Sequence, residues 1–292
     1  MSAIELRRTE TPGHAAAPLA LRSLTVWLAG GPAQPAATAV AFDLAAATGA
    51  RVTGLSAIDP AAASLRGAVP LGGLAWSKWA GDQRLNRMRE RAARALAEFQ
   101  ATSSEATVDT RVRHEEKELR ELTRVAAGTD LVVVPADIDP AGEPARFNDE
   151  LAARLAAASL SPVLRVSRRP FAVRRIAVVV SDTPACPRIA AALVRTGLWP
   201  DVPLFLVRVG AQREHVAALA EEQANLLRDH GRRVERIIDV ALDAERGEME
   251  ELLQGFDAVA IGACSNRQGW FGAVREDFHE VVVTRTALVL LP

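Results

Sequence analysis

The sequence predicts an α/β protein with two tandem domains, each a five-stranded, doubly wound parallel sheet with helices on both faces. Two observations carry this prediction. Short apolar segments that resemble buried strands alternate with helical segments along the chain, which is the pattern of right-handed βαβ units. The middle of the chain also recurs near its end, because residues 130–135 (DLVVVP) return as residues 257–262 (DAVAIG). A repeat this long indicates a duplicated domain rather than a solenoid.

The first half contains five strand segments separated by helical segments. Gly49 follows an alanine-rich helical segment and is typical of the residue that ends a helix in the left-handed conformation. A longer helical segment places apolar residues on one face, namely Leu85, Met88, Ala92, Leu96 and Phe99. The predicted strands are 24–28, 51–57, 107–112, 131–134 and 162–166, and the predicted helices are 36–48, 82–101, 116–126 and 149–158.

The second half repeats this order after a short basic stretch that contains Pro170. Its predicted strands are 176–180, 204–207, 234–240, 258–261 and 287–291, and its predicted helices are 188–196, 214–230, 245–253 and 273–283. We therefore divide the chain into a disordered N-terminal arm (1–21), a first domain (22–167), a linker (168–173) and a second domain (174–292).

The composition argues against several classes of function. The chain has 292 residues and a formal net charge of −1, which gives no electrostatic basis for binding nucleic acid or an anionic membrane. Its two cysteines provide neither a disulfide framework nor a clustered metal site, which fits a reducing cytoplasm. No apolar stretch approaches the ~20 residues of a membrane helix. We expect a cytoplasmic protein without a metal and without a nucleic-acid or membrane partner.

The loop after the fourth strand of the second half contains residues that are typical of one family. Gly262 ends the strand, Asn266 follows, and residues 267–269 read RQG. With these residues and this element order, both halves resemble universal stress protein domains, and residues 22–292 resemble the tandem members of that family. The resemblance implies a five-stranded parallel sheet in each half. In ATP-binding members, an aspartate after the first strand meets the adenine, and a G-x2-G-x9-G-S/T motif after the fourth strand binds the phosphates.

Neither half keeps that motif intact. In the second half, Ser181 stands in the position of the adenine aspartate and Asn266 in that of the second glycine, if one residue is inserted. Glu276 and Asp277 replace the Gly-Ser pair there. The first half departs further, because its corresponding positions hold Ala29, Pro135, Asp149 and Glu150, and Gly142 is the glycine that remains in its loop.

The acidic pairs change the electrostatics of both sites. A carboxylate at a helix start accepts the N–H groups that would otherwise bind phosphate, and plain helix capping is the simplest role of these residues. A carboxylate also repels a triphosphate, at a cost of about 4 kcal/mol for two unit charges ~4 Å apart at an effective dielectric near 20. We therefore expect no cofactor and no ATP binding of the usual kind, although a bridging Mg²⁺ would reduce the repulsion.

Three functions stay open at this point. The first is a non-catalytic stress-response regulator or scaffold. The second is the binding of ATP, AMP or another small molecule in the second half only, with glycine backbones around the ligand and the first strand's end near the base. The third, an enzyme, ranks last because the spacings reveal no nucleophile pair, general base or metal ligand set. The residues that would line the second-half site are Val180, Ser181, Gly262, Asn266, Gly269, Gly272, Glu276 and Asp277.

The sequence also gives expectations about protein contacts. Family dimers often pair through their last strands, so segments 162–166 and 287–291 are candidate edges for such a pair within one chain. A monomer and a homodimer both stay open, and no protein partner can be named. Core or interface packing is expected for Trp76 and Trp79, and the aromatic pair at 270–271 is a candidate partner contact.

Overall fold

The computed structural model describes residues 21–64, 73–136, 138–144, 151–159, 161–168, 172–181, 186–209, 214–240, 251–262 and 287–291. Within these residues the first half contains five strands and five helices. The strands are β1 (Ser23–Trp27), β2 (Arg51–Ile58), β3 (Thr110–Glu116), β4 (Leu131–Pro135) and β5 (Val163–Val166). The helices are α1 (Gln34–Thr48), α2 (Pro60–Ala63), α3 (Leu74–Glu105), α4 (Leu119–Ala126) and α5 (Leu151–Ala158). As predicted, Gly49 caps the C-terminal end of α1 in the left-handed conformation, with a φ of 73°.

The second half repeats the arrangement. Its strands are β6 (Ile176–Val180), β7 (Leu204–Val209), β8 (Val234–Val240), β9 (Ala258–Gly262) and β10 (Ala287–Leu291). A 3-10 turn, η2 (Cys186–Arg188), leads into α6 (Ile189–Thr196), and α7 (Glu214–Asp229) follows β7. Residues 251–254 are also helical. The predicted helix 273–283 and most of the predicted helix 245–253 lie outside the described residues.

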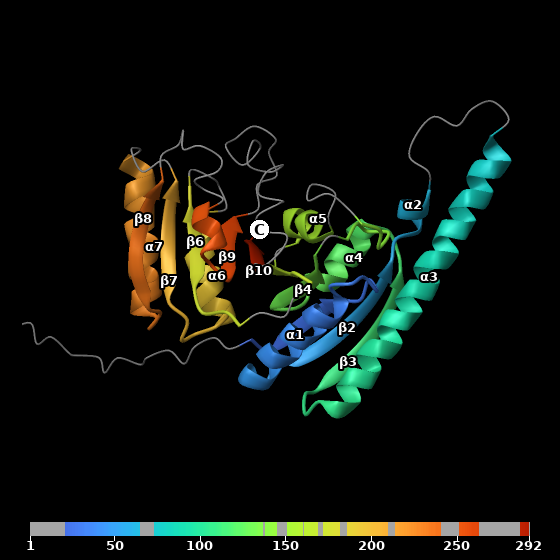
Figure 1. Ribbon diagram of the computed structural model, residues 1–292, viewed down its shortest axis with the longest axis horizontal. Coiled ribbons are helices and arrows are strands. Elements are labelled where there is room, and N and C mark those ends of the chain that lie inside the picture. Colours follow the sequence, from blue (N-terminus) through green and yellow to red (C-terminus); the bar gives the residue numbers. More distant parts are fainter. Residues whose placement is uncertain are drawn as a thin grey trace, which may run out of the picture.

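The strands of both halves join in one continuous sheet. Within the described residues its order is β3-β2-β1-β4-β5-β10-β9-β6-β7-β8, so each half has the same five-strand order and is parallel throughout. Figure 1 shows the strands crossing the molecule from β8 at one end to β3 at the other. The halves meet where β5 pairs antiparallel with β10, with Leu164 opposite Val289. The two candidate edge strands therefore pair within one chain, as expected.

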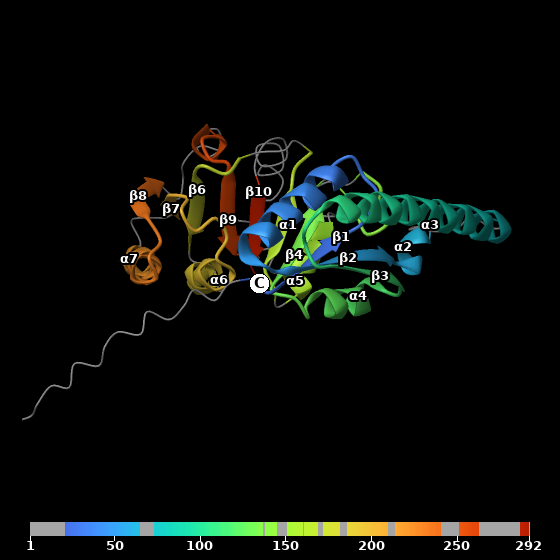
Figure 2. The same cartoon turned by 90° about the horizontal axis from the view of Figure 1, so that it is seen from below.

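Apolar side chains cover both faces of this sheet. Val26 and Leu28 pack on one face, in a core that also contains side chains of α1, α3, α6 and α7. Trp27 belongs to the core on the opposite face, which also contains side chains of α4, α5 and the helical turn at 251–254. Figure 2 shows helices on both sides of the strands. The predicted fold class is thus confirmed, and Leu21, at the end of the predicted arm, is buried in the first of these cores.

Helix α3 is much longer than the predicted segment 82–101, since it spans 32 residues. Its middle follows the predicted apolar face, with Met88, Ala92 and Phe99 buried. Its N-terminal part extends past the sheet (Figure 1), so the sheet does not cover it. Trp76 and Trp79, for which core or interface packing was expected, are 63% and 60% exposed. The expectation of core packing is therefore wrong for both tryptophans.

Strand β3 and helix α4 begin later than predicted. The predicted strand 107–112 starts at Thr110 because α3 continues to Glu105. Glu116, expected to open a helix, instead ends β3, where it pairs with Ile58 of β2 in the register. Arg89 of α3 donates to the Glu116 carboxylate, with an Nη2–Oε1 distance of 2.5 Å. Alternation of polar and apolar residues indicated this strand, but its position depends on contacts with β2 and α3.

A candidate ligand cleft at the carboxyl edge of the sheet

Each half has one point where the strand order reverses. In the first half this point lies between β1 and β4, and in the second half between β6 and β9. Open α/β sheets bind ligands outside the carboxyl ends of their strands at such a point, because the loops there diverge and leave a crevice. The resemblance places the nucleotide sites of the family at the same two positions.

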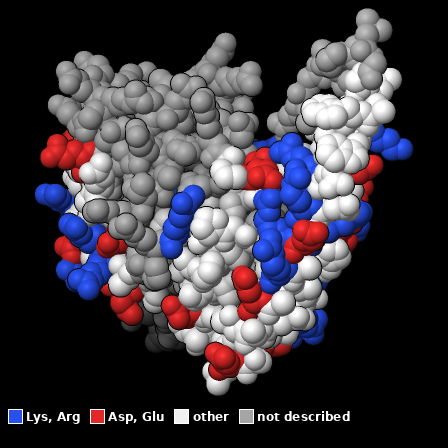
Figure 3. All heavy atoms as spheres, turned by 45° about the vertical axis from the view of Figure 1, so that its right-hand side comes forward, with Lys and Arg blue, Asp and Glu red and all other residues white. Residues whose placement is uncertain are grey.

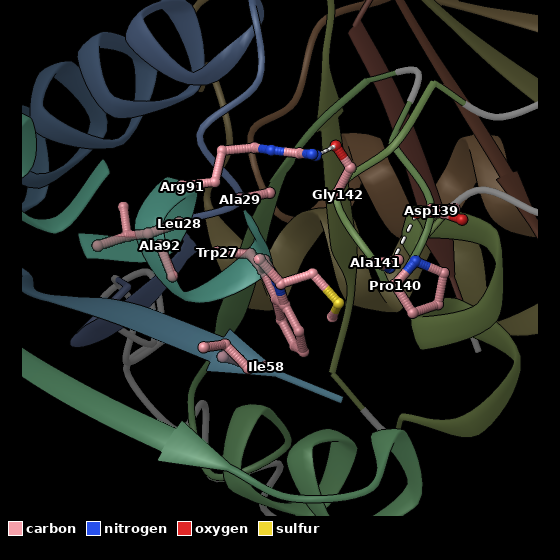
Figure 4. A pocket seen from close by; sticks show the side chains of 12 residues that line it. Trp27, Leu28, Ala29, Ile58, Arg91, Ala92, Asp139, Pro140, Ala141 and Gly142 are labelled. Atoms are coloured by element: carbon pink, nitrogen blue, oxygen red, sulfur yellow. Dashed lines mark hydrogen bonds between the residues drawn. The ribbon is translucent and has the colours of Figure 1, made fainter. Parts of the chain in front are cut away.

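The crevice of the first half is almost filled. The ends of β1 and β2, helix α3 and the loop after β4 surround a cavity of about 10 Å³. That volume holds about one water molecule, whereas typical ligand pockets measure roughly 300–1,000 Å³. Figure 4 shows the lining residues, which are Trp27, Leu28, Ala29, Ala57, Ile58, Met88, Arg91, Ala92, Asp139, Pro140, Ala141 and Gly142. Within the part of the chain that the structure describes, this cavity has no room for a nucleotide.

Arg91 of α3 reaches across this crevice to the loop after β4. Figure 4 shows its side chain pointing at the carbonyl of Gly142, to which Nη1 donates a hydrogen bond. Nη2 donates to Oε1 of Glu143 at 2.7 Å. The Arg91 side chain is only 20% exposed, so this ion pair is less screened by solvent than a pair on the open surface. Arg91 therefore ties the long helix to the loop.

Apolar packing closes the crevice beneath Arg91. Met88 and Ala92 of α3 pack against Ile58 at the end of β2 and Ala141 of the loop, in a cluster of their own. All four side chains are buried. Arg91 was not identified from the sequence, although it lies three residues after Met88 and one before Ala92. That spacing places it at the border of the buried helical face and is the signal that would have found it.

Asp139 organises the loop after β4. Its Oδ1 accepts hydrogen bonds from the backbone N–H groups of Ala141 at 2.8 Å and Glu143 at 2.9 Å. In a phosphate-binding loop, backbone N–H groups of this kind point at the anion. Here a carboxylate of the chain itself takes these donors. The sequence predicted that the acidic pairs would accept these N–H groups, but in the structure Asp139 accepts them. Asp149 and Glu150 lie outside the described residues.

The glycine that remains in the first-half loop is used for packing. Gly142 has a φ of 73°, and a Cβ at this position would lie 3.2 Å from the Ala29 carbonyl oxygen and 3.2 Å from Nη1 of Arg91. The position therefore requires glycine for two reasons, the left-handed backbone and the close approach of Arg91. Ala29, which stands where the family has its adenine aspartate, lines the same crevice.

The corresponding edge of the second half is described only in part. Val180 ends β6 and Gly262 ends β9, and these strands are parallel neighbours, so both residues lie at the carboxyl edge. Ser181 follows Val180 and is buried, and its N–H donates to Sγ of Cys186 at 3.2 Å. The remaining predicted site residues lie outside the described residues, and these are Asn266, Gly269, Gly272, Glu276 and Asp277. The aromatic pair at 270–271 lies outside them as well.

The described residues also bear on metal binding and on membrane insertion. Among them, no group of three or more histidine, cysteine, aspartate or glutamate side chains is placed to hold a metal ion. In the same part of the chain, no helix combines the length and the apolar character needed to cross a bilayer.

Two solved structures are similar to this one over nearly their whole length. A universal stress protein from Archaeoglobus fulgidus DSM 4304 aligns with a TM-score of 0.61 and 11% identity, covering 94% of this chain and 97% of that chain. A putative universal stress protein from Pseudomonas aeruginosa UCBPP-PA14 aligns with a TM-score of 0.52 and 15% identity, covering 94% of each chain. No protein-family model matches the sequence, and no curated protein is significantly similar to it. The protein therefore has the fold of the universal stress protein structures across both of its halves.

Proposed function

We propose that the protein is a non-catalytic, cytoplasmic regulator or scaffold of the universal stress type that does not bind ATP in the usual way. The observation that carries this proposal is the filled crevice of the first half, with its cavity of about 10 Å³. A nucleotide in this cavity would displace Arg91 from Gly142 and Glu143 and Met88 from its apolar cluster. The fold shared with universal stress proteins supports the stress-linked role.

The loop after β4 supports the same conclusion by a second route. Two of its backbone N–H groups are taken by the Asp139 carboxylate, so they are not available to a phosphate. A phosphate that approached would also meet the negative charge of Asp139 in place of free donors. Sterics and electrostatics therefore disfavour a triphosphate at the same position.

A second candidate function is the binding of ATP, AMP or another small molecule in the second half only. The placement of Gly262 beside the end of β6 favours this alternative, because a glycine there lets a ligand approach the backbone. Glu276 and Asp277 oppose it for a polyphosphate and leave an uncharged or singly charged ligand as the better fit.

Thermal unfolding in the presence of ATP, ADP, AMP and cyclic nucleotides, with and without Mg²⁺, separates these functions. A ligand that binds the folded state at a hundred times its Kd stabilises it by about 2.7 kcal/mol, which raises the melting temperature measurably. We expect no nucleotide to raise it. A saturable rise that persists in Glu143→Gln would support the second-half site, since Glu143 belongs to the first-half crevice. A saturable rise that Glu143→Gln changes would place the ligand in the first half and contradict the proposal.

A further inference from the structure

The N-terminal end of α3 presents large apolar side chains to solvent. Leu74, Trp76 and Trp79 are 76%, 63% and 60% exposed. Arg84 and Arg87 follow on the same helix, and neither has an ion pair within the described residues. Figure 3 turns this side of the molecule forward and shows basic side chains gathered beside the projecting end. Exposed tryptophan together with arginine is typical of binding hot spots. We call the five residues Leu74, Trp76, Trp79, Arg84 and Arg87 the tip.

A groove of opposite character lies along α7. It is open to solvent, and its volume is about 570 Å³. Its apolar lining comes from Pro187, Leu219 and Leu226, and its negative charge comes from Glu222 and Asp229. Both carboxylates are exposed, and neither has an ion pair within the described residues. We call this the α7 groove.

We infer that the tip of one copy of this protein docks in the α7 groove of a second copy. The apolar lining of the groove suits the two indole rings, and its carboxylates suit Arg84 and Arg87.

A buried glutamine beside the groove holds α7 to the turn η2. Gln223 lines the groove, and its Nε2 donates to the carbonyl oxygen of Cys186 at 3.0 Å. Its Oε1 is buried and has no hydrogen-bond partner within the described residues.

The tip cannot reach the groove of its own chain. Helix α3 packs on β2 and β3 and α7 on β7 and β8, which are at opposite ends of the ten-stranded sheet. Strands are spaced about 4.8 Å apart, so these ends are separated by roughly 40 Å. The contact therefore joins different copies head to tail, an arrangement that produces open chains or rings. This inference does not rest on the proposed function, because neither surface belongs to the clefts at the carboxyl edge.

Sedimentation velocity over about a hundredfold range of protein concentration at low ionic strength tests the contact. The tip variant Trp76→Ala/Trp79→Ala and the groove variant Glu222→Arg/Asp229→Arg change exposed side chains, so both chains keep the fold; circular dichroism and the melting temperature verify this. We expect the wild-type protein to form species larger than dimers as its concentration rises. Each variant alone should associate at least about tenfold more weakly.

Mixing provides the decisive arm of this experiment. The tip variant keeps an intact groove and the groove variant keeps an intact tip, so an equal mixture should form dimers and nothing larger. A chain that combines Arg84→Glu/Arg87→Glu with Glu222→Arg/Asp229→Arg should regain association that either charge reversal alone removes. Wild-type protein that stays monomeric, a tip variant that associates like wild type, or a mixture that forms long species would each overturn the inference. So would a monomeric protein that binds anionic lipid vesicles through Trp76 and Trp79.

Discussion

The Arg91 guanidinium of helix α3 donates a hydrogen bond to the carbonyl oxygen of Gly142, in the loop that follows the fourth strand. This contact joins α3, which has 32 residues where its second-half counterpart α7 has 16, to the loop that would surround a ligand in this fold. The same guanidinium pairs with Glu143 at 2.7 Å. The crevice is therefore closed by the chain's own side chains and not only by the loss of a sequence motif.

Replacing Arg91 with alanine should loosen this closure. The change removes two hydrogen bonds of a partly buried cation, so we expect the free energy of unfolding to fall by about 1–3 kcal/mol. Urea unfolding followed by circular dichroism measures it. Arg94→Ala is the matched control, because Arg94 is exposed on the same helix, and its effect should stay within about 0.5 kcal/mol. Equal effects of the two substitutions would show that the Arg91 contacts contribute nothing.

Gly142→Ala should cost more stability than the same change at Gly49. Both glycines have a φ of 73°, so each substitution carries the left-handed backbone penalty of about 1–2 kcal/mol. A Cβ at Gly142 also lies 3.2 Å from the Ala29 carbonyl oxygen, whereas a Cβ at Gly49 has no neighbour within 4 Å. Crowding should therefore add about 1 kcal/mol to the loss in the free energy of unfolding at Gly142. Urea unfolding of the two variants compares them directly, and equal losses would contradict the close packing of this loop.

The continuous sheet predicts that the two halves unfold together. Trp27 is buried in the first half and Trp199 is partly buried in the second, so variants that keep one tryptophan report each half separately. Their fluorescence transitions in urea should coincide. Leu206→Ala in β7 removes a buried side chain, and we expect a loss of about 2–5 kcal/mol that lowers the midpoint reported by Trp27 as well. If only the Trp199 transition moved, the halves would be independent.

The contact between Arg89 and Glu116 predicts a pH dependence. The hydrogen bond from Arg89 is the main cause that lowers the pKa of Glu116, so the folded state favours its ionised form. The stabilisation is present above the unfolded pKa of about 4.3 and is lost as the pH falls through the lower folded pKa. Glu116→Gln should therefore reduce stability slightly at pH 7, and the difference should shrink toward acid pH. Glu98→Gln, an exposed control on α3, should show no such trend; the same trend in both variants would refute the assignment.

The sequence predicted the fold through features that do not depend on distant contacts. Apolar runs such as Ile176–Val180 form buried strands at the predicted positions, and the internal repeat identified the two halves. The errors concern elements whose limits depend on neighbours. Helix α3 begins well before residue 82. The sequence did not indicate its first turns because their tryptophans are exposed and no buried apolar face marks them. Strand β3 is displaced along the chain because pairing with β2 and the contact with Arg89 determine its end.

The candidate site was predicted less completely. The sequence placed Val180 and Gly262 at strand ends, and the structure brings those ends together. It also indicated that carboxylates would take the donors of the phosphate loop, but Asp139 escaped notice because its role depends on a turn that brings Ala141 and Glu143 back to it. Arg91 was missed because its spacing from Met88 marks only the border of the buried helical face, and the residue that it contacts, Gly142, lies 51 residues away.

Nucleotide content is the most direct test of the central proposal that this protein does not bind ATP in the manner of ATP-binding universal stress proteins. Protein purified without dialysis should be denatured, and the released small molecules quantified by chromatography with absorbance at the adenine band. We predict far less than one adenine nucleotide per chain, and no increase after incubation with Mg-ATP and rapid desalting. Close to one ATP per chain, retained through desalting, would contradict the account.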